Sequence, residues 1–227
     1  MERRRMAAAG HSGRDARRDP GVENGPKMRV GGTVLCGGRS RRMGQAKAWL
    51  PWGDTTLVQH TATVLAQVVE PVIVVAAPDQ AVPPLPQHIA VVRDPIAYQG
   101  PLRGIHTALS ALAEQCDAVY VSSCDVPLLR PAFVRRLIEL SATWSICLPE
   151  VDGRVHPLAG VYRVHILPQV ERLLQTGERR PAALLAYVPS LRVPADQLRD
   201  VDPELASLRN INTPADYEQA RQAGAAS

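Results

Sequence analysis

Short apolar runs alternate with helix-like segments from Val30 to about residue 150, and this order constrains the fold more than any other feature. The run at 71–76 is continuously apolar, as in a parallel strand that is buried on both faces. A chain that alternates strand and helix buries its apolar faces by placing helices on both sides of one sheet. The pattern therefore predicts a three-layer α/β fold whose mostly parallel, doubly wound sheet is flanked by helices.

The same pattern indicates where the elements begin and end. Prolines stand at three predicted helix starts, where the amide hydrogen that proline lacks has no partner in the helix anyway: Pro101, Pro131 and Pro214. Thr213 and Asp216 flank the last of these with the spacing of a helix N-cap. We expect strands at 30–35, 71–76, 89–92, 118–123, 144–148 and 158–162, and helices at 54–69, 100–115, from 131, 166–174 and 214–223.

The formal net charge of +4 is confined to the first 29 residues. This segment holds eight Lys and Arg against four Asp and Glu, while residues 30–227 are balanced. Because it has few large apolar residues, it cannot bury enough surface to offset the entropy of ordering. We therefore expect a disordered basic tail at 1–29 and one domain at 30–227.

The tail lacks the apolar stretch of about 7–15 residues that a secretory signal requires. Three interpretations stay open: a dispensable extension ahead of a start at Met28, an organelle transit peptide, and an arm that binds nucleic acid. The four acidic residues argue against a transit peptide. Since the rest of the chain is neutral, we do not expect nucleic acid as a partner.

No apolar run approaches the ~18 residues of a membrane span, so we expect no membrane partner. The four cysteines show no C-x-x-C spacing: Cys36, Cys116, Cys124 and Cys147. We expect buried, reduced thiols, which fit a cytoplasmic protein. The six histidines show no metal-ligand pair on one turn, so a zinc site is not expected.

Candidate ligand-binding residues follow three of the predicted strands. They are the loop at 35–47, Asp94 with the segment at 100–104, and Asp125 followed by Val126 and Pro127. Because ligands of open α/β sheets bind beyond the carboxyl ends of the strands, we expect these three segments to form one site.

The first loop has the composition of a polyphosphate-binding segment. Gly37 and Gly38 make backbone amides approachable, and cations follow them closely, although the P-loop spacing is absent. Lys47 is the one lysine in residues 30–227, where arginine is otherwise used. A compact ammonium here suits phosphate oxygens, and the alternative is an exposed loop lysine.

Two carboxylates stand at strand ends. Asp125 follows an apolar strand, as in sites that hold Mg²⁺ with one carboxylate plus substrate phosphates and waters. Asp94 is placed to accept hydrogen bonds from a base or a ribose. Either aspartate also fits a plain turn residue, and the residues alone leave this alternative open.

The segment from Leu35 to Lys47 reads LCGGRSRRMGQAK and resembles the nucleotidyltransferase signature L-x-G-G-x-S-x-R-M-G-x-D-K, in the version seen in molybdenum cofactor guanylyltransferases, a MobA-like family. The likeness extends over about residues 30–222. Its later parts are Arg93-Asp94, Gly100-Pro101-Leu102-x-Gly104, Cys124-Asp125-x-Pro127, His156-Pro157, Gly177-Glu178-Arg179-Arg180 and Asn210-Ile211-Asn212-Thr213-Pro214.

The resemblance implies a Rossmann-like nucleotidyltransferase fold and Mg²⁺-dependent transfer of GMP from GTP to molybdenum-bearing molybdopterin, with release of pyrophosphate. It implies that Lys47, Asp125 and Arg42 carry the catalysis, with Asp125 as the metal ligand. The nucleotide would contact Leu35, Cys36, Gly37, Gly38, Lys47, Asp94 and Asp125, and the acceptor would contact Asn210, Asn212 and Arg179. Molybdenum-insertion or molybdoenzyme maturation proteins are the implied protein partners.

Two positions depart from the family pattern: Ala46 stands where aspartate is frequent, and Val75 stands where asparagine is expected. Glycine at position 37, where cytidylyl-type relatives carry alanine, suits the larger guanine base. Three alternatives stay open: cytidylyl transfer to molybdopterin, transfer to a sugar or alcohol phosphate, and a non-catalytic nucleotide- or nucleic-acid-binding module. Without the resemblance, Asn210 and Asn212 could organise a turn, and Arg179 could lie on a solvated face.

Overall fold

The core of the computed structural model is an eight-stranded sheet in the order β10-β7-β9-β6-β1-β4-β5, with β8 paired to β7. The structure describes residues 28–37, 46–97 and 99–225. Most of the predicted tail, and the predicted site residues Gly38 and Arg42, therefore lie outside the described residues. The strands are β1 (Val30–Leu35), β2 (Pro51–Trp52), β3 (Thr55–Thr56), β4 (Val72–Ala76), β5 (Ile89–Arg93), β6 (Ala118–Ser123), β7 (Ile146–Val151), β8 (Arg154–Val155), β9 (Ala159–Arg163) and β10 (Ser190–Pro194).

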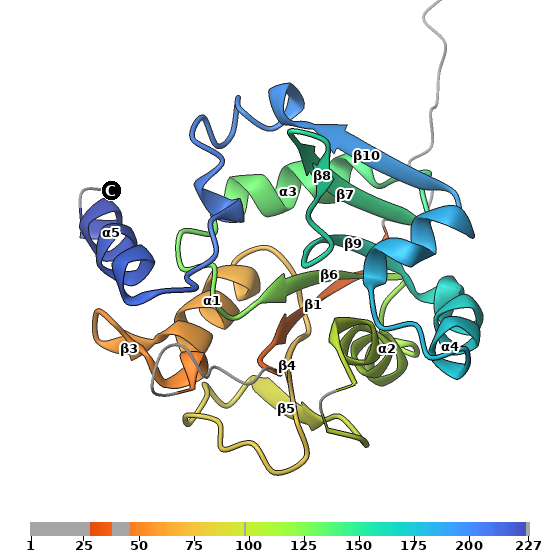
Figure 1. Cartoon of the computed structure of the whole chain (residues 1–227), viewed down its shortest axis with the longest axis horizontal. Coiled ribbons are helices and arrows are strands. Elements are labelled where there is room, and N and C mark those ends of the chain that lie inside the picture. Colours follow the sequence, from red (N-terminus) through yellow and green to blue (C-terminus); the bar gives the residue numbers. More distant parts are fainter. Residues whose placement is uncertain (1–27, 38–45, 98, 226–227) are drawn as a thin grey trace, which may run out of the picture.

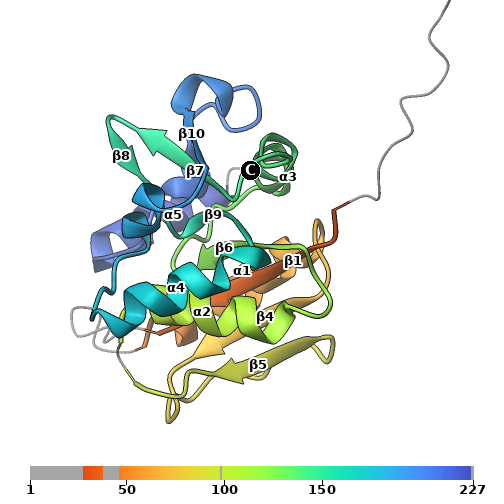
Figure 2. The same cartoon turned by 90° about the vertical axis from the view of Figure 1, so that its right-hand side faces the viewer.

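Helices cover both faces of this sheet (Figures 1 and 2). They are α1 (Leu57–Ala66), α2 (Pro101–Leu112), α3 (Pro131–Leu140), α4 (Leu167–Gln175) and α5 (Pro214–Ala225). One buried cluster joins α1 and α3 to one face, and a second joins α2 and α4 to the other. The predicted three-layer α/β fold is confirmed. No helix in the described ranges has the length and apolar character needed to cross a bilayer.

The continuous apolar run at 71–76 is explained by strand β4, which is buried from end to end. Val72 and Val74 pack in the cluster of α1 and α3, while Ile73 and Val75 pack in the cluster of α2 and α4. Since successive side chains of a strand point to opposite faces, a strand covered on both sides needs apolar residues at every position.

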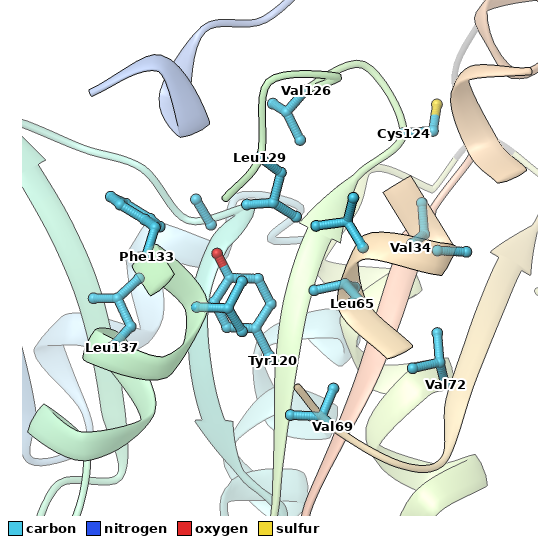
Figure 3. Packing of buried hydrophobic residues seen from close by; sticks show 14 of the residues in the cluster. Val34, Leu65, Val69, Val72, Tyr120, Cys124, Val126, Leu129, Phe133 and Leu137 are labelled. Atoms are coloured by element: carbon cyan, nitrogen blue, oxygen red, sulfur yellow. The ribbon is translucent and has the colours of Figure 1, made fainter. Parts of the chain in front are cut away.

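Two of the largest buried side chains, Tyr120 and Phe133, pack together beneath α3. Figure 3 shows Tyr120 of β6 lying among Leu129, Phe133 and Leu137, with Leu65 of α1 on its other side. Tyr120 and Phe133 are fully buried. Burial raises the pKa of the Tyr120 hydroxyl far above its ordinary range, so this group stays neutral inside the core.

Local capping signals set several helix ends as predicted. Thr56 caps α1, because the Gln59 side chain accepts a hydrogen bond from the Thr56 N–H at 2.7 Å. The prolines at 101, 131 and 214 are each the first residue of a helix. Four strands were not predicted: the hairpin of β2 and β3, and the strands β8 and β10, which are too short or too polar to show an apolar pattern.

Residues 28 and 29 belong to the predicted tail but lie within the described part of the chain. The Arg29 N–H donates to Asp117 Oδ2 at 2.8 Å, beside the start of β6. Met28 also packs against the core cluster, so the two described residues assigned to the tail both contact the domain.

Gly160 provides a stability test of the sheet. It lies on β9, against β7, and a Cβ at this position would come within 2.4 Å of Leu148 Cδ2 and 2.5 Å of the Cys147 carbonyl oxygen. Because a backbone atom of a paired strand cannot move aside cheaply, Gly160→Ala should lower the free energy of unfolding by about 1–3 kcal/mol in urea denaturation. Gly37→Ala is the control, since its Cβ would meet no atom of the described residues within 4 Å. Equal stability of the two variants would contradict this packing.

Candidate functional site

A cavity of about 490 Å³ opens at the carboxyl ends of the central strands. A volume of this size is typical of small-molecule sites. The predicted site residues that line it are Leu35, Cys36, Gly37, Lys47, Asp94, Asp125 and Asn210. The cavity thus gathers residues from all three loops that the sequence singled out.

Strand register brings these loops together. β1 is parallel to β6 on one side and to β4 on the other, with Leu35 opposite both Ser123 and Val75. Residues 36 and 124 therefore leave the sheet side by side, at the point where the strand order reverses. This is where open α/β sheets bind ligands.

Asp125 is the centre of a hydrogen-bond cluster in this cavity. Lys47 Nζ donates to its Oδ2 at 2.6 Å, and the two side chains are 18% and 13% exposed, respectively. Ser123 Oγ donates to the other oxygen, Oδ1, at 2.5 Å, and Asn210 Nδ2 donates to the same Oδ1 at 2.8 Å. Residues from three distant parts of the chain thus share one carboxylate.

A short 3-10 turn over Lys47–Trp49 positions the lysine. The Leu50 N–H donates to the Lys47 carbonyl at 3.1 Å, and Ala48 is almost fully buried. Since the turn is anchored through Ala48, the Lys47 ammonium is held over the cavity. Lys47 Nζ also donates to Asn212 Oδ1 at 3.0 Å.

The segment at 210–212 is attached to the strand end by its backbone as well. The Ile211 N–H donates to the Asp125 carbonyl at 2.9 Å. Thr213 Oγ1 caps α5 by accepting from the N–H of Asp216 at 3.1 Å. Asp216, in the first turn of the helix, accepts in return from the N–H groups of Asn212 and Thr213, and these bonds lower the pKa of its carboxyl. The predicted N-cap before the last helix is confirmed. The turn before this helix brings Asn210 within hydrogen-bond distance of Asp125 and Asn212 within hydrogen-bond distance of Lys47.

A buried aspartate holds the turn that precedes residues 210–212. Asp202 is fully buried and accepts from the N–H groups of Ala206 and Ser207 at 3.1 and 2.8 Å. Ser207 Oγ in turn accepts from the N–H of Arg130, beside the start of α3. The turn before residues 210–212 is therefore held by buried hydrogen bonds to Asp202 and joined to the start of α3 by a partly buried one.

Asp94 lines another part of the cavity, where its Oδ1 accepts from Thr107 Oγ1 at 2.6 Å. Burial raises the pKa of the Asp94 carboxyl, while the Thr107 hydrogen bond and the charges of Arg103 and His106 oppose the rise. The Gly100–Pro101 start of α2 also lines the cavity.

Arg179 does not line the cavity but lies against this helix start. Its carbonyl accepts from the Leu102 N–H at 3.2 Å, and a Cβ on Gly100 would stand 2.9 Å from Arg179 Cβ. Hydrogen bonds from Arg180 hold the pKa of the Glu178 carboxyl down at about 2, so Arg180 is paired on the surface. The segment at 177–180 thus braces the end of the cavity formed by α2.

Sequence reasoning missed several residues at or beside the cavity, and Ala77, Gln99 and Leu158 are among those that line it. Ser123 lines it and bonds Asp125, and Val75 lines it although its departure from the family pattern had excluded it. Gln80 Nε2 donates to the Cys36 carbonyl at 3.0 Å. Ser123 follows from the two-residue period of β6, whereas nothing local to Gln80 indicates its partner.

The described residues contain no group of three or more His, Cys, Asp and Glu that could hold a metal ion by themselves. The carboxylate in the cavity is that of Asp125, and the Lys47 ammonium lies 2.6 Å from one of its oxygens. One carboxylate suits a cation such as Mg²⁺, which takes its other ligands from water and substrate phosphates.

Comparisons with known proteins agree with this geometry. A family model described as MobA-like NTP transferase domain matches residues 32–193. A Mycobacterium avium protein named as a molybdenum cofactor guanylyltransferase is 39% identical over 204 residues, covering 87% of this chain and 98% of the relative.

Solved structures share the fold. Molybdopterin-guanine dinucleotide biosynthesis protein A from Archaeoglobus fulgidus has a TM-score of 0.72 at 22% identity, covering 87% of this chain and 100% of its own. A Mycobacterium tuberculosis protein crystallised with manganese has a TM-score of 0.57 at 19% identity, covering 86% and 98%. At these identities the structural likeness concerns the fold alone.

The hydrogen bond between Thr107 and Asp94 has a testable effect on titration. Thr107→Val removes the donor that favours the carboxylate, so the pKa of Asp94 should rise further above its ordinary value. The acidic limit of the pH range in which Asp94 is ionised then moves upward. Carbon NMR titration of the carboxyl groups measures this shift. Thr107→Ser, which keeps the hydroxyl, should show the wild-type titration, and an unshifted Asp94 in Thr107→Val would refute the assignment.

Proposed function

The chain belongs to the MobA-like NTP transferase family, and from this membership we propose that it transfers GMP from GTP to the terminal phosphate of molybdenum-bearing molybdopterin, releasing pyrophosphate. One observation carries the proposal: Lys47, Asp125 and Asn210 meet in one cavity at the strand ends. The Lys47 ammonium, suited to phosphates, and the Asn210 amide both donate hydrogen bonds to the Asp125 carboxylate, which is suited to a metal.

The nucleoside would lie where β1 and β4 end, against the backbone of Leu35, Cys36 and Gly37, with Asp94 as an acceptor for the base or ribose. The N1–H and N2–H groups of guanine can donate hydrogen bonds to an ionised carboxylate. The triphosphate would extend toward Lys47. Gly38 and Arg42 belong to the same proposal by sequence alone, as further phosphate contacts.

Asp125 would hold Mg²⁺, and its place in the cavity at the end of β6 supports this role. When bound, the metal supplies charge neutralisation on the triphosphate. Lys47 would stabilise the negative charge that develops on the departing pyrophosphate, and Arg42 would assist it. In-line attack by the acceptor phosphate on the α-phosphorus needs positioning and charge compensation more than proton transfer.

The acceptor would lie beside Asn210 and Asn212, which flank Asp125 and Lys47. We propose that Arg179, at the start of α2, also contacts the acceptor. The acceptor and the nucleotide would then approach Asp125 from different sides.

We propose further that residues 30–227 act as one domain, with the tail outside it. The four cysteines are free and buried, which supports a reducing, cytoplasmic setting. Molybdenum-insertion and molybdoenzyme maturation proteins are the proposed protein partners, as the family resemblance implies.

Pyrophosphate release tests the reaction. Each of the four nucleoside triphosphates is supplied with and without molybdenum-loaded molybdopterin, and pyrophosphate should appear with GTP and the acceptor together. Release with CTP in place of GTP would indicate cytidylyl transfer. Release with a sugar or alcohol phosphate as acceptor would indicate another nucleotidyltransferase, and no release under any condition would favour a non-catalytic binding module.

Asp125→Asn tests the metal-binding carboxylate. The amide keeps the shape of the side chain but removes its charge, so turnover should fall by at least about 100-fold. Circular dichroism and thermal melting show whether the fold is retained. A folded variant with wild-type turnover would overturn the role of Asp125.

Gly37 tests the choice of base. A Cβ here would meet no atom within 4 Å in the part of the chain that the structure describes, and the residue lines the cavity, so Gly37→Ala would place a methyl group where the base is expected. The KM for GTP should rise several-fold with little change in kcat. The kcat/KM for CTP, which has the smaller base, should change less. An unchanged ratio of kcat/KM for GTP over CTP would contradict this position for the base.

A further inference from the structure

The two oxygens of the Asp125 carboxylate have different surroundings. Oδ1 accepts from two neutral donors, Ser123 Oγ at 2.5 Å and Asn210 Nδ2 at 2.8 Å. Oδ2 accepts from the Lys47 ammonium at 2.6 Å. One oxygen is thus held by the protein's neutral groups, and the other already faces a cation.

We propose that Ser123 is a positioning residue that, together with Asn210, occupies Asp125 Oδ1, so that a divalent cation binds Oδ2 in place of the Lys47 ammonium. This inference rests on the proposed metal role of Asp125. It adds Ser123, which the sequence signature does not contain, and it specifies which oxygen of the Asp125 carboxylate binds the metal.

Ser123 is suited to this role by its place at the end of β6. Its side chain is mostly buried, and its hydroxyl lines the cavity beside the aspartate two residues further on. The Asn210 amide also approaches Ser123 Oγ, at 3.4 Å, so the two donors brace each other. The neighbouring Ser122 is different, because its hydroxyl donates to the backbone carbonyl of Ser123 at 3.1 Å.

A carboxylate held in this way favours some cations over others. Mg²⁺ and Mn²⁺ prefer octahedral oxygen ligands, and Mg²⁺ tolerates little distortion, whereas Ca²⁺ readily takes both oxygens of one carboxylate. With Oδ1 already accepting two hydrogen bonds, Asp125 offers one oxygen. The Ser123 hydroxyl therefore opposes binding of Ca²⁺ through both oxygens and favours the smaller ions.

Mn²⁺ is the probe for the first test. Unbound Mn²⁺ is counted by electron paramagnetic resonance in samples of the full-length protein with GTP and no acceptor. GTP samples without protein correct for Mn²⁺ held by the nucleotide alone. Because partners that orient a metal ligand commonly contribute 10- to 100-fold to affinity, Ser123→Ala should weaken Mn²⁺ binding by about tenfold. Ser123→Thr keeps a hydroxyl and should restore it, and Ser122→Ala should match the wild type.

Competition by Ca²⁺ separates positioning from a general structural loss. Ser123→Ala frees one side of Oδ1, so Ca²⁺ should displace Mn²⁺ at a lower ratio of Ca²⁺ to Mn²⁺ than in the wild type. Equal weakening of both ions, or wild-type Mn²⁺ binding in Ser123→Ala, would overturn the inference. Asp125→Asn shows which proposal has failed. If Asp125→Asn binds Mn²⁺ as the wild type does, Asp125 is not the metal ligand. If Asp125→Asn loses Mn²⁺ binding but Ser123→Ala keeps it, the role of Ser123 alone is refuted.

Discussion

The parallel register of β1 against β6 is the constraint on which the rest of the site depends. Leu35 lies opposite Ser123, so the loop that begins at Cys36 and the aspartate at 125 leave the sheet at neighbouring points. A shift of one residue would turn every side chain of β6 to the other face and move Ser123 away from the cavity. The register is held by burial, because side chains of both strands pack into clusters on both faces of the sheet.

The cluster around Asp125 joins segments that are far apart in the sequence. Lys47 comes from the loop after β1, and Asn210 and Asn212 come from the turn before α5. A buried carboxylate would be costly without partners, and here it receives an ammonium, a hydroxyl and an amide. The arrangement needs the C-terminal turn in place, and the buried bonds of Asp202 supply that.

Much of this architecture was predictable because it is encoded locally. The apolar run of β4, the prolines that begin α2, α3 and α5, and the cap at Thr213 each follow from neighbouring residues, and the structure agrees with them. The strands β8 and β10 were not predictable, since β10 is largely exposed and its residues carry no apolar period. Tertiary pairing with β7 makes β10 a strand.

By itself, the sequence determined the fold class, the three loops at the strand ends and the likeness to a family of nucleotidyltransferases, because short-range patterns and a signature carry this information. Only the tertiary structure decided which atoms meet. That Lys47 and Asn210 bind different oxygens of Asp125 and that Gln80 holds Cys36 depend on contacts between residues distant in the chain, whereas Ser123 reaches Asp125 from two residues away. Such contacts are set by strand register and buried hydrogen bonds, which no local pattern specifies.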